Sequence, residues 1–314
     1  MKSPAATDPI HAELPQNLWG KVLSATPIVM TVVATMLAGL ASSEMTRAQY
    51  DRALAAQLQS KAGDQWNFFQ AKKLRSAVQR STVDMITTTA TVRPLDATAL
   101  TTALDTGAGP SAPNAASAPD AWKILQGGKF PELAAGAPMD PHVAAALAAL
   151  ESSRPEREVS ALLVPVSEDV LTQTLQAARD RVLSVDALMA PINQAVDGLE
   201  QTVNHRTGRE GSAELIRDFT VARLRSTARR YDLEARQNQI IANLYELEVR
   251  KSNFSAERHH VRSTRFFYGM LAAQMGVIIS TFAMAARKRN LLWSIAAAAG
   301  LTAISFAVYV YLYV

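Results

Sequence analysis

The C-terminal end of the chain decides its fold. Residues 266–286 read FFYGMLAAQMGVIISTFAMAA, and residues 291–314 read LLWSIAAAAGLTAISFAVYVYLYV. Neither stretch contains a charged residue, and each is long enough to cross a hydrocarbon core about 30 Å thick as a helix. Only the basic turn RKRN at 287–290 separates them. A helix buried in a soluble core is seldom so long and so free of charge on every face, so the pattern predicts a transmembrane hairpin.

A third uncharged stretch lies near the N-terminus, from Val22 to Ala41, after a tail at 1–21. The competing interpretation is a cleaved signal peptide, which has a short apolar core followed by small residues at the cleavage site. Alanines do follow this stretch, but it is longer than such a core. We therefore predict a retained membrane helix at 22–41, with Pro27 in its first turn and Thr26 as its cap.

The basic residues near the three spans bear on their orientation. Within about 20 residues of the spans, the region between the first and second span carries eight Lys or Arg residues, whereas the tail and the hairpin turn together carry five. This count predicts a cytoplasmic middle region. The short turn has the higher charge density, however, and long domains can be translocated regardless of charge, so the opposite orientation stays open.

Four segments are predicted between the first and second spans. They are a stalk helix at 42–90 that continues the first span, a flexible Ala/Pro-rich linker at 91–165, a heptad helix at 166–205 and a return stalk helix at 212–265. The linker includes TGAGPSAPNAASAPD at 106–120, a composition that cannot bury enough apolar surface to offset its conformational entropy. One short helix is expected inside the linker, from Pro141 to about Ser153.

The heptad helix carries the clearest soluble pattern. Ser167 is a good N-cap, and apolar side chains then repeat in four-three alternation at Leu171, Leu175, Ala178, Val182, Val185, Met189, Ile192, Val196, Leu199 and Val203. Pro191 interrupts the helix without shifting this register, which predicts a kink. About eight residues connect Val203 to a helix from Ser212, so the two helices should pair antiparallel, with Val203 near Leu215 or Phe219.

The two stalk helices carry weaker patterns. In the first, a seam containing Ala48, Ala55, Ala62, Trp66 and Phe69 would let another helix approach closely. In the return helix, large apolar residues recur at multiples of seven, and a second row is rich in arginine. The apolar row consists of Phe219, Leu233, Ile240, Leu247, Phe254 and Val261, with Ser226 in the gap. We predict that this row faces the other helices and that arginine stems cover apolar surface beside it.

Two stretches carry a resemblance to a known family. DQWNFFQAK at 64–72 and ERHH at 257–260, followed by RKRNLLW at 287–293, resemble a bacterial membrane-protein family catalogued as domain-of-unknown-function family 4337. The positions that match its pattern are Asp64, Trp66, Phe69, Gln70, Ala71, Glu257, Arg258, His259, His260, Arg287, Lys288, Arg289 and Trp293. The resemblance covers roughly 22–80 and 235–314. It implies a bacterial membrane location and this topology, and it brings no known activity.

The candidate interaction residues are taken from these motifs: Asp64, Trp66, Phe69, Gln70, Lys72, Glu257, Arg258, His259 and His260. His259 and His260 are adjacent and point about 100° apart on a helix, so they cannot jointly chelate one metal ion in the usual way. A polar collar just outside the bilayer and a pH-responsive contact stay open for them. We predict that Glu44 pairs with His259 or Arg262, because each lies close to its membrane boundary.

Trp66 is expected to pack in a helix seam, although a binding role for its stacking face stays open. It lies 25 residues beyond Ala41, and 25 residues before Phe266 is Ile241. If the two stalk helices leave the membrane straight and antiparallel, Trp66 should contact Ile240, Ile241 or Leu244, and Asp64 should reach Arg236 or another arginine.

Several function classes find no support in the sequence. The chain has no cysteine, which excludes disulfides, thiolate metal sites and cysteine nucleophiles. No glycine-rich phosphate loop, metal-ligand cluster or nucleophile elbow is present. No basic stripe with interleaved aromatics indicates nucleic-acid binding. We therefore expect no catalytic residue, no cofactor and no metal site.

The sequence predicts an all-α membrane protein with three transmembrane helices and a long helical coiled-coil stalk between the first and second. Its expected location is the bacterial inner membrane, as a multi-pass protein. Its expected role is a membrane-anchored helical scaffold that binds the lipid bilayer and, through the stalk, a protein partner or a second copy of itself. The alternative is an oligomeric transport or channel component, which would need ionisable groups inside the membrane. Enzyme function is the least supported.

Overall fold

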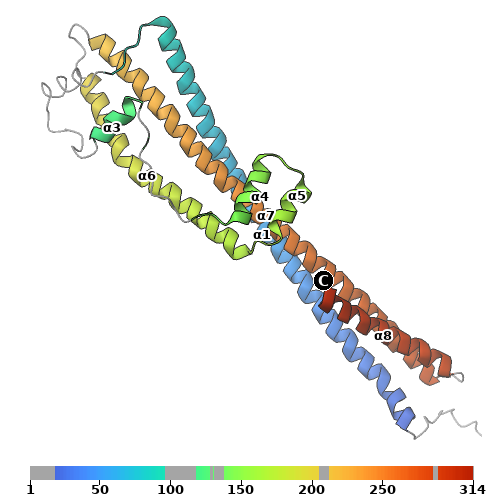
Figure 1. The fold of residues 1–314 in the computed structure, drawn as a ribbon. Helices are drawn as coiled ribbons and strands as arrows, with labels where there is room; N and C mark the ends of the chain where they lie inside the picture. The colour runs from blue at the N-terminus through green and yellow to red at the C-terminus, as the bar shows by residue number, and fades with distance from the viewer. Residues whose placement is uncertain are drawn as a thin grey trace, which may run out of the picture. The chain divides into compact units, whose positions relative to one another are not determined.

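The structure is a computed structural model that describes residues 18–95, 118–127, 130, 138–204, 212–285 and 289–313. Within these ranges the regular structure is helical, and no strand occurs. The helices are α1 (Leu18–Thr89), α3 (Ala118–Leu125), α4 (Pro141–Glu151), α5 (Glu156–Leu163), α6 (Glu168–Asn204), α7 (Ser212–Ala285) and α8 (Arg289–Tyr313) (Figure 1). The chain is therefore all-α, as predicted, and α1, α7 and α8 are each long and apolar enough to cross a membrane.

The described residues fall into two compact units. The span unit comprises residues 1–55 and 252–314, and the middle unit comprises residues 56–251. Both α1 and α7 contribute residues to both units, so each predicted stalk helix is one continuous helix with its span. The first family motif lies in the middle unit and the second lies in the span unit.

The span unit is built by α8 and by the membrane-spanning parts of α1 and α7. Its core is small, with Met30, Ala34 and Leu37 of α1 against Ala273 of α7 and Ala303 of α8. Large apolar side chains such as Ile278 and Leu301 lie on the outside, where a bilayer rather than water is their natural solvent. Small residues fit these close contacts, because a Cβ at Gly269 would lie 3.3 Å from Cβ of Phe306 and 3.4 Å from the carbonyl oxygen of Ala303.

The boundaries of the spans differ from the prediction in two places. Helix α1 begins at Leu18, so Pro27 lies inside the helix and not in its first turn. The predicted cap at Thr26 is therefore wrong. A proline inside a helix removes one backbone hydrogen bond, a loss that neighbouring groups in membrane helices can compensate. Helix α8 begins at Arg289, so the end of the predicted basic turn is helical, whereas Arg287 and Lys288 lie outside the described residues.

In both units, contacts join α1 to α7. Residues farther along α1 contact residues earlier in α7, so the two helices run antiparallel. In the span unit, Ser263 Oγ donates to the carbonyl oxygen of Ala41 at 2.7 Å, and Ser252 Oγ donates to that of Asp51 at 2.7 Å. A side-chain hydroxyl can reach a backbone carbonyl of the other helix only when the two backbones lie close together. Small buried residues permit that approach, and they recur at multiples of seven on both helices. They are Ala34, Ala41, Ala48, Ala55, Ala62, Ser76 and Val83 on α1, and Ala228, Ala235, Ala242, Val249, Ala256 and Ser263 on α7.

The seam predicted for the return helix is wrong in part. Phe219, Ser226 and Leu247 are buried, but Ile240 and Phe254 are 39% and 54% exposed. The row that contains Ala235, Ala242 and Ala256 is buried in their place. Close packing of two backbones leaves no room for a phenylalanine at the contact, so the large side chains lie beside it.

We expect Ala48→Leu to destabilise the span unit by about 1–3 kcal/mol, because Ala48 is fully buried and a larger side chain would force the helices apart. Ala53→Leu is the matched control, since Ala53 lies on the same helix but is exposed. Thermal unfolding of both variants in detergent, followed by circular dichroism, measures the difference. Equal unfolding temperatures for the two variants would contradict the close alanine contact.

The middle unit is organised by the pairing of α6 with α7, as predicted. All ten positions of the α6 seam are buried or half-buried. Val203 and Phe219 lie in the same apolar cluster, and Leu215 packs against it. Helix α6 begins after Ser167, whose Oγ accepts a hydrogen bond from the backbone N–H of Val170 at 3.3 Å. The antiparallel hairpin, its contact near Val203 and its N-cap are thus confirmed.

The region predicted as a linker with one short helix contains three. Helix α4 begins at Pro141, as expected, and Asp140 caps it by accepting from the backbone N–H groups of His142 and Val143. Helices α3 and α5 were not predicted. Each has only eight residues, too few to be stable alone, and each depends on burying one apolar face. In α3 that face consists of Ala121, Ile124 and Leu125, which join the α6–α7 cluster. Residues 96–117 lie outside the described residues.

Candidate functional site

Trp66 of the first motif contacts α7 within the middle unit, and Phe69 packs beside it, whereas Phe68 is exposed. The Trp66 and Phe69 rings meet edge to face, with centroids 5.4 Å apart and an interplanar angle of 87°. Trp66 Nε1 donates a hydrogen bond to Oε1 of Glu246 at 2.8 Å. Asp64 and Gln70 lie on the exposed side of the same helix, and the ion pair predicted for Asp64 does not occur within the described residues.

The hydrogen bond of Trp66 belongs to a short chain of polar contacts that joins three helices. Glu246 of α7 also accepts from Nη1 of Arg250 at 3.2 Å, and Arg250 Nε donates to both carboxylate oxygens of Glu156 on α5 at 2.9 and 3.1 Å. Burial alone would lower the pKa of Arg250, but its hydrogen bonds to the two glutamates outweigh burial and raise it. The guanidinium of Arg250 therefore joins Glu156 on α5 to Glu246 on α7, which also accepts from Trp66 on α1.

Lys72 of the first motif also contacts α7. It forms an ion pair with Glu234, and its Nζ lies 5.3 Å from the centroid of the Tyr231 ring. The guanidinium groups of Arg75 and Arg230 lie 5.9 and 5.2 Å from the same ring, so three cations surround one aromatic side chain. Cations attract the negative face of an aromatic ring, and the Tyr231 ring therefore helps to hold α1 and α7 together.

A second cluster of charges lies next along these helices. Asp232 of α7 pairs with Lys73 at 3.2 Å and with Arg80 of α1. Burial alone would raise the pKa of Asp232, but the nearby cations outweigh it and lower the pKa. These pairs are partly exposed, so each contributes little to stability. Their main effect is to fix which residues of α1 lie opposite α7.

The second motif lies in the span unit and joins α7 to α1. His259 Nδ1 lies 2.5 Å from Oε2 of Glu44, and His259 Nε2 lies 4.0 Å from Oδ2 of Asp51. The predicted contact of Glu44 with His259 is confirmed. Glu257 is exposed and pairs with Arg52 at 3.9 Å. His260 is half-buried, and its Nδ1 has no hydrogen-bond partner among the described residues.

The α6–α7 pair buries a carboxyl group that the motifs do not include. Glu248 Oε1 accepts a hydrogen bond from Oγ1 of Thr172 at 3.4 Å, and the guanidinium of Arg179 lies 5.1 Å from the neighbouring Tyr245 ring. Burial raises the pKa of Glu248, although Thr172 and Arg179 oppose the shift. The periodic pattern in the sequence predicted α6 and α7. It could not predict that their contact covers Glu248, because that depends on the register between the two helices.

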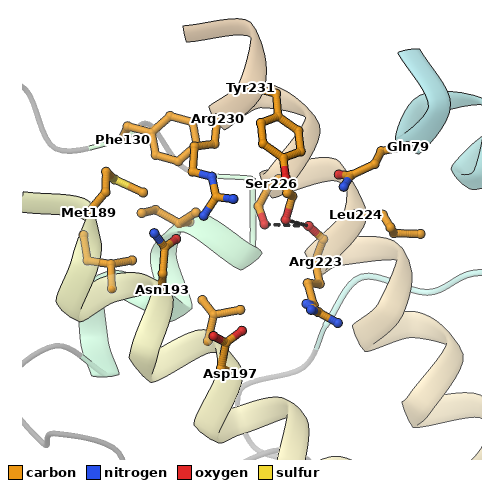
Figure 2. Close-up of a pocket in the computed structure, with 14 residues that line it drawn as sticks. Gln79, Phe130, Met189, Asn193, Asp197, Arg223, Leu224, Ser226, Arg230 and Tyr231 are labelled. Atoms are coloured by element: carbon orange, nitrogen blue, oxygen red, sulfur yellow. Dashed lines mark hydrogen bonds between the residues drawn. The ribbon is translucent and has the colours of Figure 1, made fainter. Parts of the chain in front are cut away.

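The middle unit also contains a cavity of about 290 Å³ (Figure 2). Its lining combines Asn193 and Asp197 from α6 with Arg223, Arg230 and Tyr231 from α7. Ser226 and Thr227 line it as well, but both hydroxyls already donate to the carbonyl oxygen of Arg223, at 2.8 and 2.9 Å. Periodicity within single helices could not predict this cavity, because its lining also includes Gln79 of α1, Ile124 of α3 and Phe130. On α7, the sequence signal for this polar lining was the spacing of Arg223, Thr227 and Arg230, which lie one and two turns apart on one face of the helix.

The geometry of the two motifs is that of contacts between helices. The first supplies a hydrogen bond, an ion pair and a cation–ring contact that join α1 to α7 in the middle unit, and the second supplies a hydrogen bond and ion pairs that join them in the span unit. Among the described residues, no group of three or more His, Cys, Asp or Glu side chains lies close enough to hold a metal ion.

Comparison with known proteins supports the family resemblance over part of the chain. Residues 19–108 match the model of a family described as Domain of unknown function (DUF4337). The match includes the first motif and ends before the second motif and the C-terminal hairpin. No curated protein and no solved structure matches the chain. The family description names no activity, so function has to be argued from the structure.

Proposed function

We propose that this protein is a membrane-anchored helical scaffold. The N-terminal part of its chain matches a family without an assigned activity. Its three apolar helices would hold it in a bilayer, in line with the expected bacterial inner membrane, and its middle unit would bind another protein. Supporting this, the motif residues Trp66 and Lys72 engage α7 of their own unit. They would therefore shape the middle unit and leave binding to a different surface.

One observation carries the interaction role: an apolar stripe on α1 that no described residue of the middle unit covers. Leu74, Val78 and Met85 are 66%, 57% and 63% exposed. Their spacing of four and seven residues puts them on one face of the helix, together with the exposed small residues Ala71 and Ser81. Ser76 and Val83 are buried and lie on the opposite face, toward α7.

The spacing of the stripe indicates the kind of partner. Apolar residues at helical spacing on a helix outside the membrane are typical of a surface that packs against another helix. Isolated exposed apolar residues are common on protein surfaces, but a continuous row is unusual and marks an interaction site. We propose that the partner contributes an amphipathic helix to this face. A second copy of the chain and a different protein are both compatible with this chemistry, and the experiment separates them.

We expect Val78→Asp to weaken partner binding by about 30-fold or more, because a central apolar anchor of an interface typically contributes at least 2 kcal/mol. Ala77→Asp is the matched control, since it places the same charge one residue away, at an exposed position beside the stripe. The full-length protein would be crosslinked in native membranes and the products purified and identified. Self-crosslinking lost only in Val78→Asp indicates a second copy, and loss of a different polypeptide indicates a separate partner.

Two results would overturn the interaction role. One is a wild-type protein that forms no crosslink at the stripe, either to itself or to another protein. The other is an identical set of crosslinked products from Val78→Asp and Ala77→Asp. Circular dichroism of both variants should show unchanged helix content, because both positions are exposed.

Transport is the less supported function. The three apolar stretches contain no Asp, Glu, Lys, Arg or His, and ion or proton pathways generally require such groups inside the membrane. Gln274 is the strongly polar residue in the spans, and together with Thr31 and Thr35 it lines an open groove of about 430 Å³. The hydroxyls of Thr31 and Thr35 already donate to the carbonyl oxygens of Pro27 and Thr31. Ion flux into liposomes containing the purified protein would favour transport over the scaffold role.

A further inference from the structure

A groove at one end of the spans has the chemistry of a lipid-binding site. It is lined by Arg265 of α7 and by residues of α8, namely Leu301, Thr302, Ser305, Phe306 and Tyr309. Its volume is about 480 Å³. All six residues belong to the span unit.

The groove lies at the membrane boundary. Arg265 directly precedes the uncharged stretch that begins at Phe266, so its guanidinium lies at the level of the lipid headgroups. Within the span unit, α8 runs antiparallel to the end of α7, because Arg265 contacts Tyr309 and the Tyr268 ring contacts the Phe306 ring, with centroids 6.3 Å apart. The C-terminal end of α8 is thereby placed beside Arg265.

No carboxylate among the described residues pairs with the guanidinium of Arg265. Its guanidinium carbon lies 5.4 Å from the centroid of the Tyr309 ring, a cation–π contact that orients the group. No carboxylate lines the groove, and no ion pair involving Arg265 occurs in the described part of the chain. The guanidinium of Arg265 can therefore pair with an anion from outside the protein, and phosphates are the anions most abundant at this depth of a bilayer.

The groove changes in character along α8. Tyr309 is separated from Leu301 by eight residues, or about 12 Å of helix. Arg265 and Tyr309 supply polar groups at the boundary, Phe306 and Ser305 lie about one turn deeper, and Leu301 supplies apolar surface toward the bilayer interior. The hydroxyl of Thr302 already donates to the carbonyl oxygen of Ala298 at 2.9 Å, whereas Ser305 makes no hydrogen bond within the described residues. Ser305 therefore has a hydroxyl that can donate to a ligand.

We propose that this groove binds one phospholipid molecule. Its phosphodiester accepts hydrogen bonds from the guanidinium of Arg265 and the hydroxyl of Ser305, and one acyl chain lies along Phe306 and Leu301. The absence of a carboxylate from the groove lining disfavours a headgroup ammonium, so an anionic lipid binds more tightly than a zwitterionic one. The site needs only the membrane spans and does not depend on the partner proposed for the middle unit.

Titration of the delipidated, full-length protein in detergent with phosphatidylglycerol, followed by native mass spectrometry, tests the proposal. We expect wild-type protein to retain one lipid and Arg265→Gln to bind it at least tenfold more weakly, because hydrogen bonds to a charged group are among the stronger ones in proteins. Ser305→Ala should bind about threefold more weakly. Arg47→Gln is the matched control, since Arg47 is exposed, lies close to the first span and does not line the groove.

Further arms separate a specific lipid site from other kinds of anion binding. Equal losses in Arg265→Gln and Arg47→Gln would show general attraction to charge and overturn the site. Displacement of the lipid by millimolar inorganic phosphate or glycerol phosphate would show a site for a free anion and overturn the lipid assignment. If Arg265→Gln lacks the helix content of wild type, Arg265→Lys keeps the charge and loses the forked geometry. Undiminished lipid binding by Arg265→Lys and Ser305→Ala together would also overturn the proposal.

Discussion

Replacing Val185 and Ile192 of α6 with aspartate is expected to unfold the α6–α7 hairpin while leaving the protein in the membrane. Both side chains are more than nine-tenths buried in the cluster that joins α3, α6 and α7. Each substitution removes apolar contacts and buries a carboxyl group with no partner, which costs about 3 kcal/mol or more. Because a whole domain is stabilised by only about 5–15 kcal/mol, the two together should abolish the hairpin. Circular dichroism and limited proteolysis of the full-length protein in detergent measure the loss.

The same helix offers a matched control. Leu183 and Leu188 are 67% and 37% exposed, so Leu183→Asp with Leu188→Asp introduces the same charges into α6 on its open side. This control should unfold nearly as wild type does. Equal helix loss in the two double variants would mean that charge on α6, and not burial in the seam, causes the effect. Wild-type stability in the variant with aspartate at 185 and 192 would contradict the hairpin itself.

Trp66→Ala should have the second-largest effect, a loss of about 3 kcal/mol in the stability of the middle unit. The substitution removes the edge contact with Phe69 and the hydrogen bond to Glu246, and it leaves a gap between α1 and α7. Glu246 keeps its contact with Arg250, so the loss comes mainly from packing. Chemical denaturation of the full-length protein, followed by circular dichroism, gives the free-energy difference.

Two further variants separate packing from the hydrogen bond of Trp66. Trp66→Phe keeps an aromatic ring against Phe69 but has no indole N–H, so it should cost about 1 kcal/mol. Phe68→Ala truncates an aromatic side chain two residues away that is 54% exposed, and it should change stability by less than about 0.5 kcal/mol. A loss in Trp66→Ala no larger than in Phe68→Ala would show that the indole does not join the helices.

The register between α1 and α7 was only partly predictable. Counting residues from the membrane placed Trp66 near Ile240, Ile241 or Leu244; its indole N–H donates to Glu246, and packing against those three residues stays a prediction. Closeness to the membrane boundary placed Glu44 beside His259 or Arg262, and its contact with His259 is confirmed. Counting gives the level of a residue along the stalk, whereas the partner that a long side chain reaches depends on its rotamer and on the side chains around it.

The sequence by itself determined the helical fold, the three apolar spans and the α6 seam, because these depend on hydrophobic length and periodicity within one segment. The tertiary structure alone decided which residues meet. It selected the alanine row of α7 over the row of Ile240 and Phe254, and it stabilised α3 and α5. It also brought Arg265 to Tyr309. The physical reason is that a periodic pattern shows which face of a helix is apolar, whereas the distance between two backbones and their register depend on side chains from both helices at once.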